Sequence, residues 1–134
     1  MREWLQNSAI KAADRLAAGR PQPTPSQAAL RSCKIIAHRG EHDNQSIIEN
    51  TLPAFDNART KGVWGIECDI RWTADLVPVI NHDPCGRRLF GKSTPVSRLS
   101  FAQLRAQMPQ IPSLEELLCE FGGNTHLMLE IKAE

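Results

Sequence analysis

The alternation of apolar runs with polar segments along the chain predicts a sheet of short strands. Four apolar runs have strand length: Lys34–Ala37, Gly65–Trp72, Val77–His82 and His126–Lys132. Between several of these runs, apolar residues recur every three or four positions, which is the spacing of a helix with one buried face. The resulting order of strand, helix, strand, strand, helix, strand predicts an α/β sheet.

Three of the predicted helices have recognisable start signals. Thr51 stands where a helix cap is expected, Pro53 falls in the first turn, and Lys61-Gly62 provides a stop. Two capping boxes predict the starts of the other helices: Ser100 with Gln103, and Ser113 with Glu116.

One connection does not fit a sheet that is parallel throughout. Thr73–Leu76 separates the second and third predicted strands, whereas a crossover between parallel strands takes about a dozen residues or more. The relative direction of these two strands therefore stays open at the level of sequence.

The start of the chain differs in character from the rest. Arg2–Ala18 has an apolar stripe with helical spacing, so residues 1–20 are predicted to form an N-terminal helix. A basic amphipathic helix could be a membrane or targeting element, but acidic residues dilute its charge, and packing over the open end of a domain is the preferred interpretation. Residues 21–33 are rich in proline and predict a stiff extended linker, which leaves residues 34–134 as the folded domain.

Composition argues against several kinds of partner. A formal net charge of +1 gives no general attraction to nucleic acid or to an anionic membrane, and tyrosine is absent. No apolar run approaches the roughly 20 residues of a membrane span, so no stable membrane insertion is expected. The four cysteines are scattered without a Cys-x-x-Cys pair, which favours reduced thiols and a cytoplasmic location over two disulfides.

Acidic residues occupy positions that converge in a folded sheet. Glu67 and Asp69 share one face of the second strand while Cys68 points the other way, and Glu130 follows in the last strand. Three carboxylates at one end of a sheet would repel each other unless a cation neutralises them. Since oxygen ligands suit a hard ion, the three residues predict a divalent cation site for Ca²⁺ or Mg²⁺. Any one of them alone would more often be a solvated strand end or half of a salt bridge.

Two histidines, His38 and His82, end predicted strands. Imidazole takes or gives a proton near neutral pH, so the pair predicts general acid and base catalysis with the two roles unassigned. Arg39 offers a planar fork of donors and Lys132 a point charge, which predicts binding of phosphate oxygens. Asp83 is expected to orient His82 or to cap the loop that follows.

Other charged residues carry weaker signals. His42 lies in a polar loop and His126 at the beginning of a strand, so both are interpreted as surface residues. Arg87 and Arg88 are interpreted as surface charges or as charges at the rim of a substrate site.

These residues fall into blocks with a fixed order and spacing: Lys34-Ile35-Ile36-Ala37-His38-Arg39-Gly40, Glu49-Asn50-Thr51-Leu52-Pro53-Ala54-Phe55, Glu67-Cys68-Asp69, His82-Asp83 and Glu130-Ile131-Lys132. The set resembles the glycerophosphodiester phosphodiesterase family from about Lys34 to Lys132. The resemblance implies metal-dependent hydrolysis of glycerophosphodiesters to an alcohol and glycerol 3-phosphate. It implies that His38 and His82 are the catalytic pair and that the three carboxylates hold the cation. It also favours a role for Glu49 at the site, either contacting substrate with Arg39 and Lys132 or orienting a ligand.

The same resemblance implies a fold, the phosphodiesterase variety of the (β/α)8 TIM barrel. Such a barrel needs about 250 residues, so the chain of 134 residues is expected to form only the first four strands, the N-terminal half of the catalytic domain. Two positions depart from the family pattern: Leu76 stands where glycine is usual, and Ile48 where proline is usual. Half a barrel would be open to self-association.

Two other functions stay open. A phospholipase-like phosphodiesterase of lipid head groups would need an apolar rim for acyl chains, against which the polar loop Glu41–Gln45 argues. A catalytically inactive fragment or binding protein could retain the cation site without turnover. The presence of both His38 and His82 argues against lost chemistry.

Overall fold

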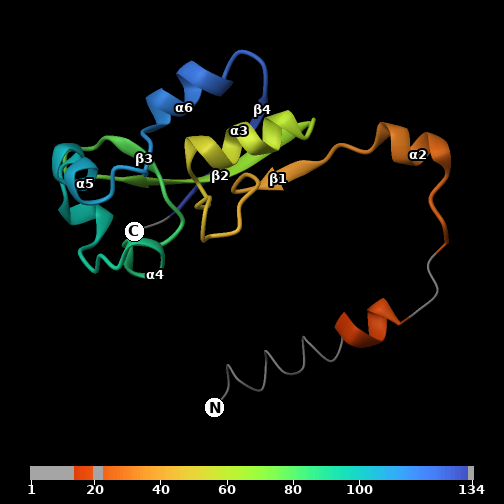
Figure 1. Ribbon diagram of the computed structural model, residues 1–134, viewed down its shortest axis with the longest axis horizontal. Coiled ribbons are helices and arrows are strands. Elements are labelled where there is room, and N and C mark those ends of the chain that lie inside the picture. Colours follow the sequence, from red (N-terminus) through yellow and green to blue (C-terminus); the bar gives the residue numbers. More distant parts are fainter. Residues whose placement is uncertain (1–13, 20–22, 133–134) are drawn as a thin grey trace. The chain divides into compact units, whose positions relative to one another are not determined.

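The computed structural model describes residues 14–19 and 23–132 (Figure 1). The chain divides into two compact units, Met1–Cys33 and Lys34–Glu134, and the second unit contains the sheet. In the part of the chain that the structure describes, no helix is both long and apolar enough to cross a membrane.

The described residues of the first unit are exposed and include two helical segments. Residues 14–18 are helical and form the end of the predicted helix Arg2–Ala18, whose earlier residues lie outside the described ones. Helix α2 (Gln27–Ser32) interrupts the predicted extended linker. It begins there because the Ser26 hydroxyl accepts a hydrogen bond from the Ala29 N–H at 3.1 Å.

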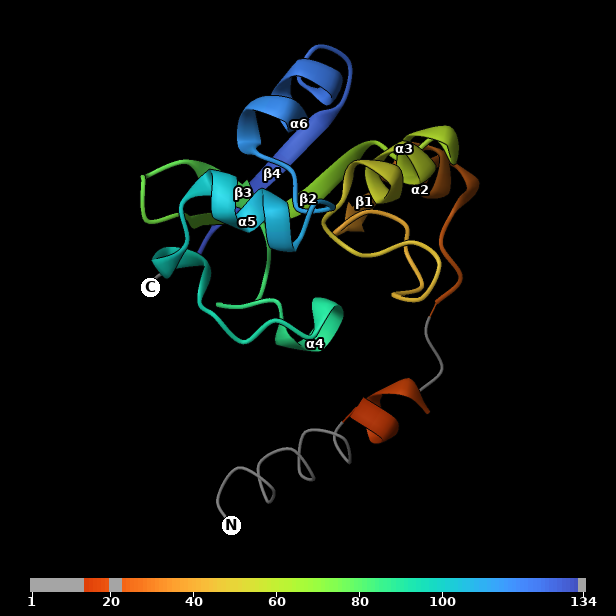
Figure 2. The same cartoon turned by 60° about the vertical axis from the view of Figure 1, so that its left-hand side comes forward.

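Three strands of the sheet are parallel. β1 (Ile36–His38) and β4 (His126–Ile131) both pair with β2 (Gly65–Trp72), so β2 is the central strand. The register places His38 opposite Glu67, and Asp69 opposite Glu130. The carboxyl ends of β1, β2 and β4 therefore lie at one edge of the sheet, as Figure 2 shows from the side.

The second and third strands form a hairpin, which resolves the direction that the sequence left open. β3 (Pro78–Ile80) pairs antiparallel with the last residues of β2. The turn closes where the Thr73 N–H donates to the Val77 carbonyl at 3.0 Å. Leu76 adopts φ 62° in this turn, a conformation that favours glycine. Of the four expected strands, three thus lie parallel and β3 folds back across the end of β2.

Two helices cover one face of the sheet (Figure 1). α3 (Leu52–Thr60) and α6 (Leu114–Phe121) pack their apolar residues on Ile66, Cys68 and Ile70 of β2. Phe55 and Phe121 meet edge to face, with ring centroids 6.0 Å apart. Each fully buried side chain of this size contributes about 1.5–3 kcal/mol, so this layer is the main support of the sheet.

The starts of the helices agree with prediction except for one hydroxyl. Both capping boxes form, Ser100 with Gln103 at α5 (Phe101–Gln107) and Ser113 with Glu116 at α6. Thr51 is the cap residue of α3, but its side chain makes no capping bond. The Thr51 hydroxyl donates instead to the Ile48 carbonyl at 2.6 Å, which closes the loop in front of the helix.

A second apolar cluster supports the long connection between β3 and α6. It contains Val79 of β3, Val96 of the 3₁₀ helix η1 (Val96–Arg98), and Leu104 of α5. Phe90 packs against this cluster from α4 (Arg87–Phe90), a single helical turn with no buried residue. The position of α4 is therefore set by one aromatic contact and by the polar contacts described below.

Candidate active site at the carboxyl edge of the sheet

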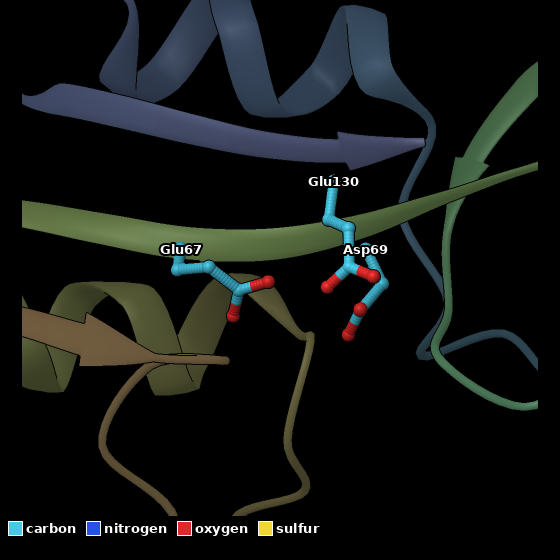
Figure 3. A group of neighbouring side chains, drawn as sticks. All are labelled: Glu67, Asp69 and Glu130. Atoms are coloured by element: carbon cyan, nitrogen blue, oxygen red, sulfur yellow. The ribbon is translucent and has the colours of Figure 1, made fainter. Parts of the chain in front are cut away.

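Three carboxylates from adjacent strands converge at the carboxyl edge of the sheet (Figure 3). Glu67 and Asp69 of β2 and Glu130 of β4 offer oxygen atoms that all lie within 4.8 Å of one another. Glu67 and Asp69 are buried, whereas Glu130 is exposed. Cys68 between them faces the helices and is buried in the core. The predicted convergence of the three side chains is confirmed, and their role as cation ligands stays a prediction.

The pKa values of the two buried carboxyls move in opposite directions. Burial, followed by the neighbouring Asp69 charge, raises the pKa of Glu67. Burial also acts to raise the pKa of Asp69, but hydrogen bonds from Asn50 and Lys132 outweigh it, and the pKa of Asp69 is lowered. Glu67 Oε1 is buried and has no hydrogen-bond partner among the described residues. A hard cation would be the partner that this oxygen lacks, so the donor set fits Ca²⁺ or Mg²⁺.

Arg39 enters the site from the turn that follows β1. It adopts φ 60°, which is uncommon for a residue other than glycine. Gly40 follows at φ 84° and has no room for a side chain, because a Cβ would lie 2.7 Å from the Ala54 carbonyl carbon. The Arg39 guanidinium lies between two acids, with Nε 3.1 Å from Asp69 Oδ2 and Nη1 donating to Glu49 Oε1 at 3.0 Å. No hydrogen bond to a described residue uses Arg39 Nη2, so that nitrogen can bind a phosphate oxygen.

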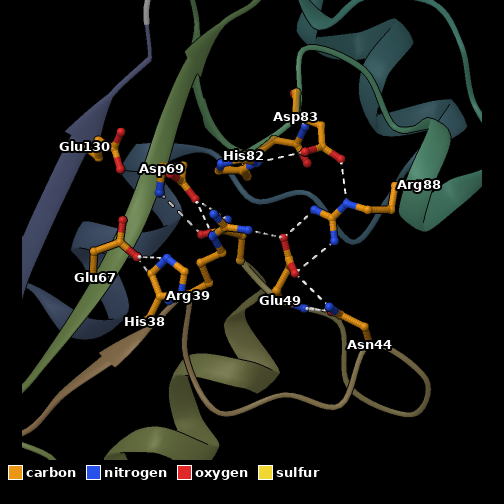
Figure 4. Close-up of polar contacts among 12 residues, drawn as sticks. His38, Arg39, Asn44, Glu49, Glu67, Asp69, His82, Asp83, Arg88 and Glu130 are labelled. Carbon is orange, nitrogen blue, oxygen red and sulfur yellow. Dashed lines mark hydrogen bonds and ion pairs between the residues drawn. The ribbon is translucent and has the colours of Figure 1, made fainter. Parts of the chain in front are cut away.

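Glu49 is held by donors on all sides (Figure 4). Its buried carboxylate accepts from Arg39 Nη1 and Arg88 Nη2 on one oxygen, and from Asn44 Nδ2 and Arg88 Nη1 on the other. A carboxylate has about four acceptor positions, so none is left for substrate. Burial acts to raise the pKa of Glu49, but hydrogen bonds from Arg88, Asn44 and Arg39 lower it to about 2. Of the two roles left open for Glu49, orienting a neighbour agrees with this geometry better than contacting substrate.

The two histidines lie on different sides of the acidic cluster (Figure 4). His38 ends β1, and its Nε2 lies 3.8 Å from Glu67 Oε2 with the imidazole largely exposed. His82 follows β3, and its Nδ1 lies 2.8 Å from Asp83 Oδ1. Because a carboxylate accepts this bond, Nδ1 carries the proton and Nε2 is the unprotonated ring nitrogen. The geometry gives Asp83 the first of its two expected roles, that of orienting His82.

Lys132 adds a second positive charge to the cluster from the residue after β4. Its Nζ lies 2.9 Å from Asp69 Oδ1 and also pairs with Glu130. The hydrogen bond to Glu130, followed by the one to Asp69, raises the pKa of Lys132. The ammonium is therefore charged beside the carboxylates, in the position expected of a group that contacts an anionic substrate.

Two of the residues that hold Glu49, Asn44 and Arg88, have no clear signal in the sequence. The sequence places Asn44 in a polar loop and predicts Arg88 as a surface or rim charge. Arg88 lies 39 positions from Glu49 along the chain, and no periodicity relates the two. The available signal was charge balance, because a buried acid needs a cation, and Arg39 is shared with Asp69.

The other two histidines take no part in these contacts. His126 is exposed, as expected, and stacks on Trp64 with ring centroids 4.0 Å apart. His42 is only half-exposed, and its buried Nδ1 has no hydrogen-bond partner within residues 14–19 and 23–132.

Sequence comparison identifies a family and relatives that match this part of the chain. A model of the glycerophosphoryl diester phosphodiesterase family matches residues 38–134, which include every site residue described above. Glycerophosphodiester phosphodiesterase 1 of Mus musculus is 36% identical over 132 residues, a match that covers 83% of this chain and 39% of the mouse protein. The protein of the same name from Homo sapiens is 33% identical over 132 residues with the same coverage. The chain thus spans about two fifths of the length of these curated relatives.

Solved structures confirm the fold class. Glycerophosphodiester phosphodiesterase from Thermotoga maritima superposes with a TM-score of 0.69 at 30% identity, covering 75% of this chain and 45% of that one. A phosphodiesterase from Oleispira antarctica, solved with the product sn-glycerol-3-phosphate, gives 0.61 at 28% identity, covering 78% and 47%. These neighbours are TIM barrels, and the chain matches somewhat less than half of each.

Proposed function

The chain belongs to the glycerophosphoryl diester phosphodiesterase family, and we propose that it carries the cation-binding and proton-transfer residues of an enzyme that hydrolyses glycerophosphodiesters to an alcohol and glycerol 3-phosphate. One observation carries the proposal. Polar residues at the ends of three adjacent parallel strands meet at one edge of the sheet, where a cation, a phosphate and two imidazoles could act together. The glycerol 3-phosphate bound by the Oleispira antarctica relative is the product that this reaction would release.

Glu67, Asp69 and Glu130 would hold one divalent cation, Ca²⁺ or Mg²⁺. When bound, the cation would neutralise charge on the phosphate and lower the pKa of the attacking hydroxyl or water. The buried Glu67 Oε1 supports this assignment, because it has no hydrogen-bond partner among the described residues. Burial and the neighbouring Asp69 charge raise the pKa of Glu67, and a bound cation would oppose both effects.

The two histidines would move the protons of the reaction. The attacking oxygen forms a bond to phosphorus, and the bond between phosphorus and the alcohol oxygen breaks. One imidazole takes the proton of the attacking group, and the other gives a proton to the departing alcohol. Two nucleophiles fit this scheme: water, or a hydroxyl of the substrate's own glycerol followed by hydrolysis of the cyclic phosphate. In His82, the bond from Nδ1 to Asp83 leaves Nε2 for this transfer.

Arg39 and Lys132 would bind the phosphate as its charge increases. Arg39 would reach the phosphate through Nη2, which makes no hydrogen bond to a described residue, while Nε lies beside Asp69 and Nη1 donates to Glu49. Lys132 lies beside Asp69 and adds a compact charge. Donors that are already fixed in place stabilise a developing charge without reorganising.

The test is substrate hydrolysis by the protein expressed from its complete natural reading frame. Glycerophosphocholine and glycerophosphoethanolamine should both be tried, with EDTA and with added Ca²⁺ or Mg²⁺. We expect His38→Ala and His82→Ala each to lower kcat by about 10²–10⁴-fold, with unchanged circular dichroism. His126→Ala is the matched control, because this exposed imidazole contacts Trp64 and none of the site residues. Absence of hydrolysis by the wild type with either ion would reject the function, whereas full kcat in one variant would reject the role of that histidine alone.

A further inference from the structure

We infer that Arg88 is a positioning residue that fixes Arg39 and His82 together, through Glu49 and Asp83. The inference rests on the proposed function for what Arg39 and His82 do. It assigns a role to α4, a helical turn that otherwise has no place in the reaction.

All three nitrogens of the Arg88 guanidinium have acidic partners. Nη2 donates to Glu49 Oε1 at 2.6 Å and Nη1 donates to Glu49 Oε2 at 3.1 Å. Nε donates to Asp83 Oδ2 at 2.8 Å. The pair of parallel bonds fixes the plane of the Glu49 carboxylate, which a single bond would leave free to rotate. These contacts join two segments that are distant in the chain.

Through Glu49, Arg88 determines which nitrogens of Arg39 remain available to bind phosphate. Glu49 is buried, and without Arg88 its charge would be compensated only by Arg39 and by the neutral amide of Asn44. Arg39 also forms an ion pair with Asp69, with Nε 3.1 Å from Oδ2, so without Arg88 two buried acids would compete for one guanidinium. With Arg88 in place, Glu49 needs only one nitrogen of Arg39. The Nη2 of Arg39 is thereby left for phosphate.

Through Asp83, Arg88 determines the orientation of His82. Asp83 uses one oxygen for His82 Nδ1 and the other for Arg88 Nε. The two bonds together fix the rotation of the carboxylate, and the carboxylate in turn holds the proton on Nδ1. A continuous series of hydrogen bonds thus runs from His82 through Asp83, Arg88 and Glu49 to Arg39 (Figure 4).

The adjacent residue shows that this role is specific to one arginine of α4. Arg87 is exposed, its Nε donates to Ser93 Oγ at 3.2 Å, and it forms no ion pair with the described residues. Ion pairs between exposed side chains contribute little, with a median near zero to about 1 kcal/mol. Arg88 is itself partly exposed, so its effect depends on the burial of Glu49, at 4% exposure. Arg87 therefore provides a control with the same charge on the same helical turn.

The experiment compares Arg88→Met, Arg88→Lys, Glu49→Gln and the double variant Arg88→Met/Glu49→Gln in the protein from its complete natural reading frame. We expect Arg88→Met to lower kcat on glycerophosphocholine by about 10–100-fold, the range for residues that orient others, with a smaller change in KM. Arg88→Lys should recover only part of this loss, because an ammonium cannot replace a two-bond fork. In the Glu49→Gln background, Arg88→Met should cost much less than it does alone. Arg87→Met should keep kcat.

Two further measurements do not depend on the substrate. The first is ¹⁵N NMR of the histidine rings, assigned with His82→Gln, in which wild type and Arg87→Met should show protonated Nδ1 at His82. Arg88→Met should show a mixture of tautomers. The second is urea unfolding of the same four variants, in which Arg88 and Glu49 should be coupled rather than additive.

The outcomes separate the inference from the function on which it rests. Wild-type kcat in Arg88→Met, additive losses in the double variant, or an unchanged His82 tautomer would each overturn the positioning role while hydrolysis by the wild type stands. No hydrolysis by the wild type, together with a shifted tautomer and coupled unfolding, would reject the proposed function and support the positioning role. Misfolding of Arg88→Met would appear in circular dichroism, in which case Arg88→Lys and the tautomer measurement decide.

Discussion

The acidic residues of the site differ in how much of their charge the chain already compensates. Asp69 has Arg39 and Lys132 beside it, and Glu49 has Arg39 and Arg88. Glu67 accepts a hydrogen bond from the backbone N–H of Arg39 at Oε2, and its Oε1 has no partner in the part of the chain that the structure describes. At the scale of single residues, Glu67 is thus the carboxylate that gains most from an added cation.

A loss of Glu67 should therefore weaken cation binding strongly. We expect Glu67→Gln to reduce the affinity for Ca²⁺ and Mg²⁺ by at least about 10–100-fold. Losses of that size are typical when a residue that hydrogen-bonds to a metal ligand is changed, and here a predicted ligand itself is changed. Calorimetric titration of each ion into the protein from its complete natural reading frame measures this. Glu41→Gln is the control, because this exposed acid pairs with Lys61 and not with the cluster. Equal affinities in Glu67→Gln and wild type would remove Glu67 from the cation site.

The lowered pKa of Glu49 predicts a specific loss of stability in acid. The pKa falls from its ordinary 4.5 to about 2, so the folded state binds this proton less readily than the unfolded chain. The stabilisation is present above the unfolded value and is lost as the pH falls through the folded value. A full shift of this size would correspond to about 3 kcal/mol as an upper bound. We expect the free energy of unfolding to fall less in Glu49→Gln than in wild type between about pH 5 and about pH 3.

Urea unfolding at several pH values checks this dependence. Glu120→Gln is the control, because Glu120 is exposed on α6 and takes part in no ion pair among the described residues. Its curve should run parallel to that of the wild type. Parallel curves for Glu49→Gln and wild type would show that Glu49 does not stabilise the fold as a carboxylate.

At the scale of elements, the hairpin between β2 and β3 contains a strained residue. Leu76 adopts φ 62° with a side chain that is 76% exposed, so a glycine there would relieve strain and lose little burial. A left-handed conformation costs a residue with a side chain roughly 1–2 kcal/mol, part of which the greater freedom of unfolded glycine offsets. We expect Leu76→Gly to raise the free energy of unfolding by about 0.5–1 kcal/mol.

The reciprocal change tests the same reasoning. Gly62 has φ 74°, and no atom lies within 4 Å of a Cβ built on it. Gly62→Ala therefore changes only the backbone preference, and should lower the free energy of unfolding by about 1 kcal/mol. Both values come from urea denaturation. A decrease on Leu76→Gly would mean that the turn is held by contacts of the leucine side chain.

Local signals predicted the elements, and long-range contacts limited what could be predicted beyond them. The box of Ser113 and Glu116 was readable because both partners lie within one helical turn. The ends of the strands could also be predicted from local apolar runs, and the polar residues in or just after these runs include His38, Glu67 and the other acids of the site. The direction of β3 could not be predicted, because the four residues Thr73–Leu76 are too few for a parallel crossover but do not by themselves specify a hairpin. The role of Arg88 could not be predicted either, because its partner Glu49 lies 39 positions away in the sequence.

Helix α2 was missed for a different reason. Prolines dominate the segment before it and predict an extended linker. The capping signal was a single serine, Ser26, whose helix lasts only six residues. A cap without an apolar stripe is weak evidence in a sequence, and no residue of α2 is buried in the described structure.

At the scale of the whole molecule, the unit Lys34–Glu134 leaves both outer parallel strands with one free edge among the described residues. β1 and β4 each pair with β2 alone. Met128, Leu129 and Ile131 of β4 are 53%, 38% and 71% exposed. An unpaired strand with exposed apolar side chains is a template for association with another chain.

These 134 residues on their own are therefore expected to self-associate or aggregate and to show no measurable hydrolysis of glycerophosphodiesters. Size-exclusion chromatography with light scattering, combined with the assay above, tests both parts. Ile131→Lys should reduce association, because a charge on an edge strand opposes pairing. A stable, active monomer would refute the expectation as a whole. An active dimer would refute only the lack of activity.

The register between β2 and β4 has a consequence for how this part of the sheet can evolve. Asp69 lies opposite Glu130, and successive side chains of a strand point to opposite faces. Deleting one residue of β4 before Glu130 would turn Glu130 and Lys132 toward the helices and bring Ile131 into the site, with none of the three replaced. Insertions and deletions are therefore expected to be tolerated in the turn at residues 122–124 and to be selected against in β4. In β4, the spacing of the residues is under the same constraint as their identity.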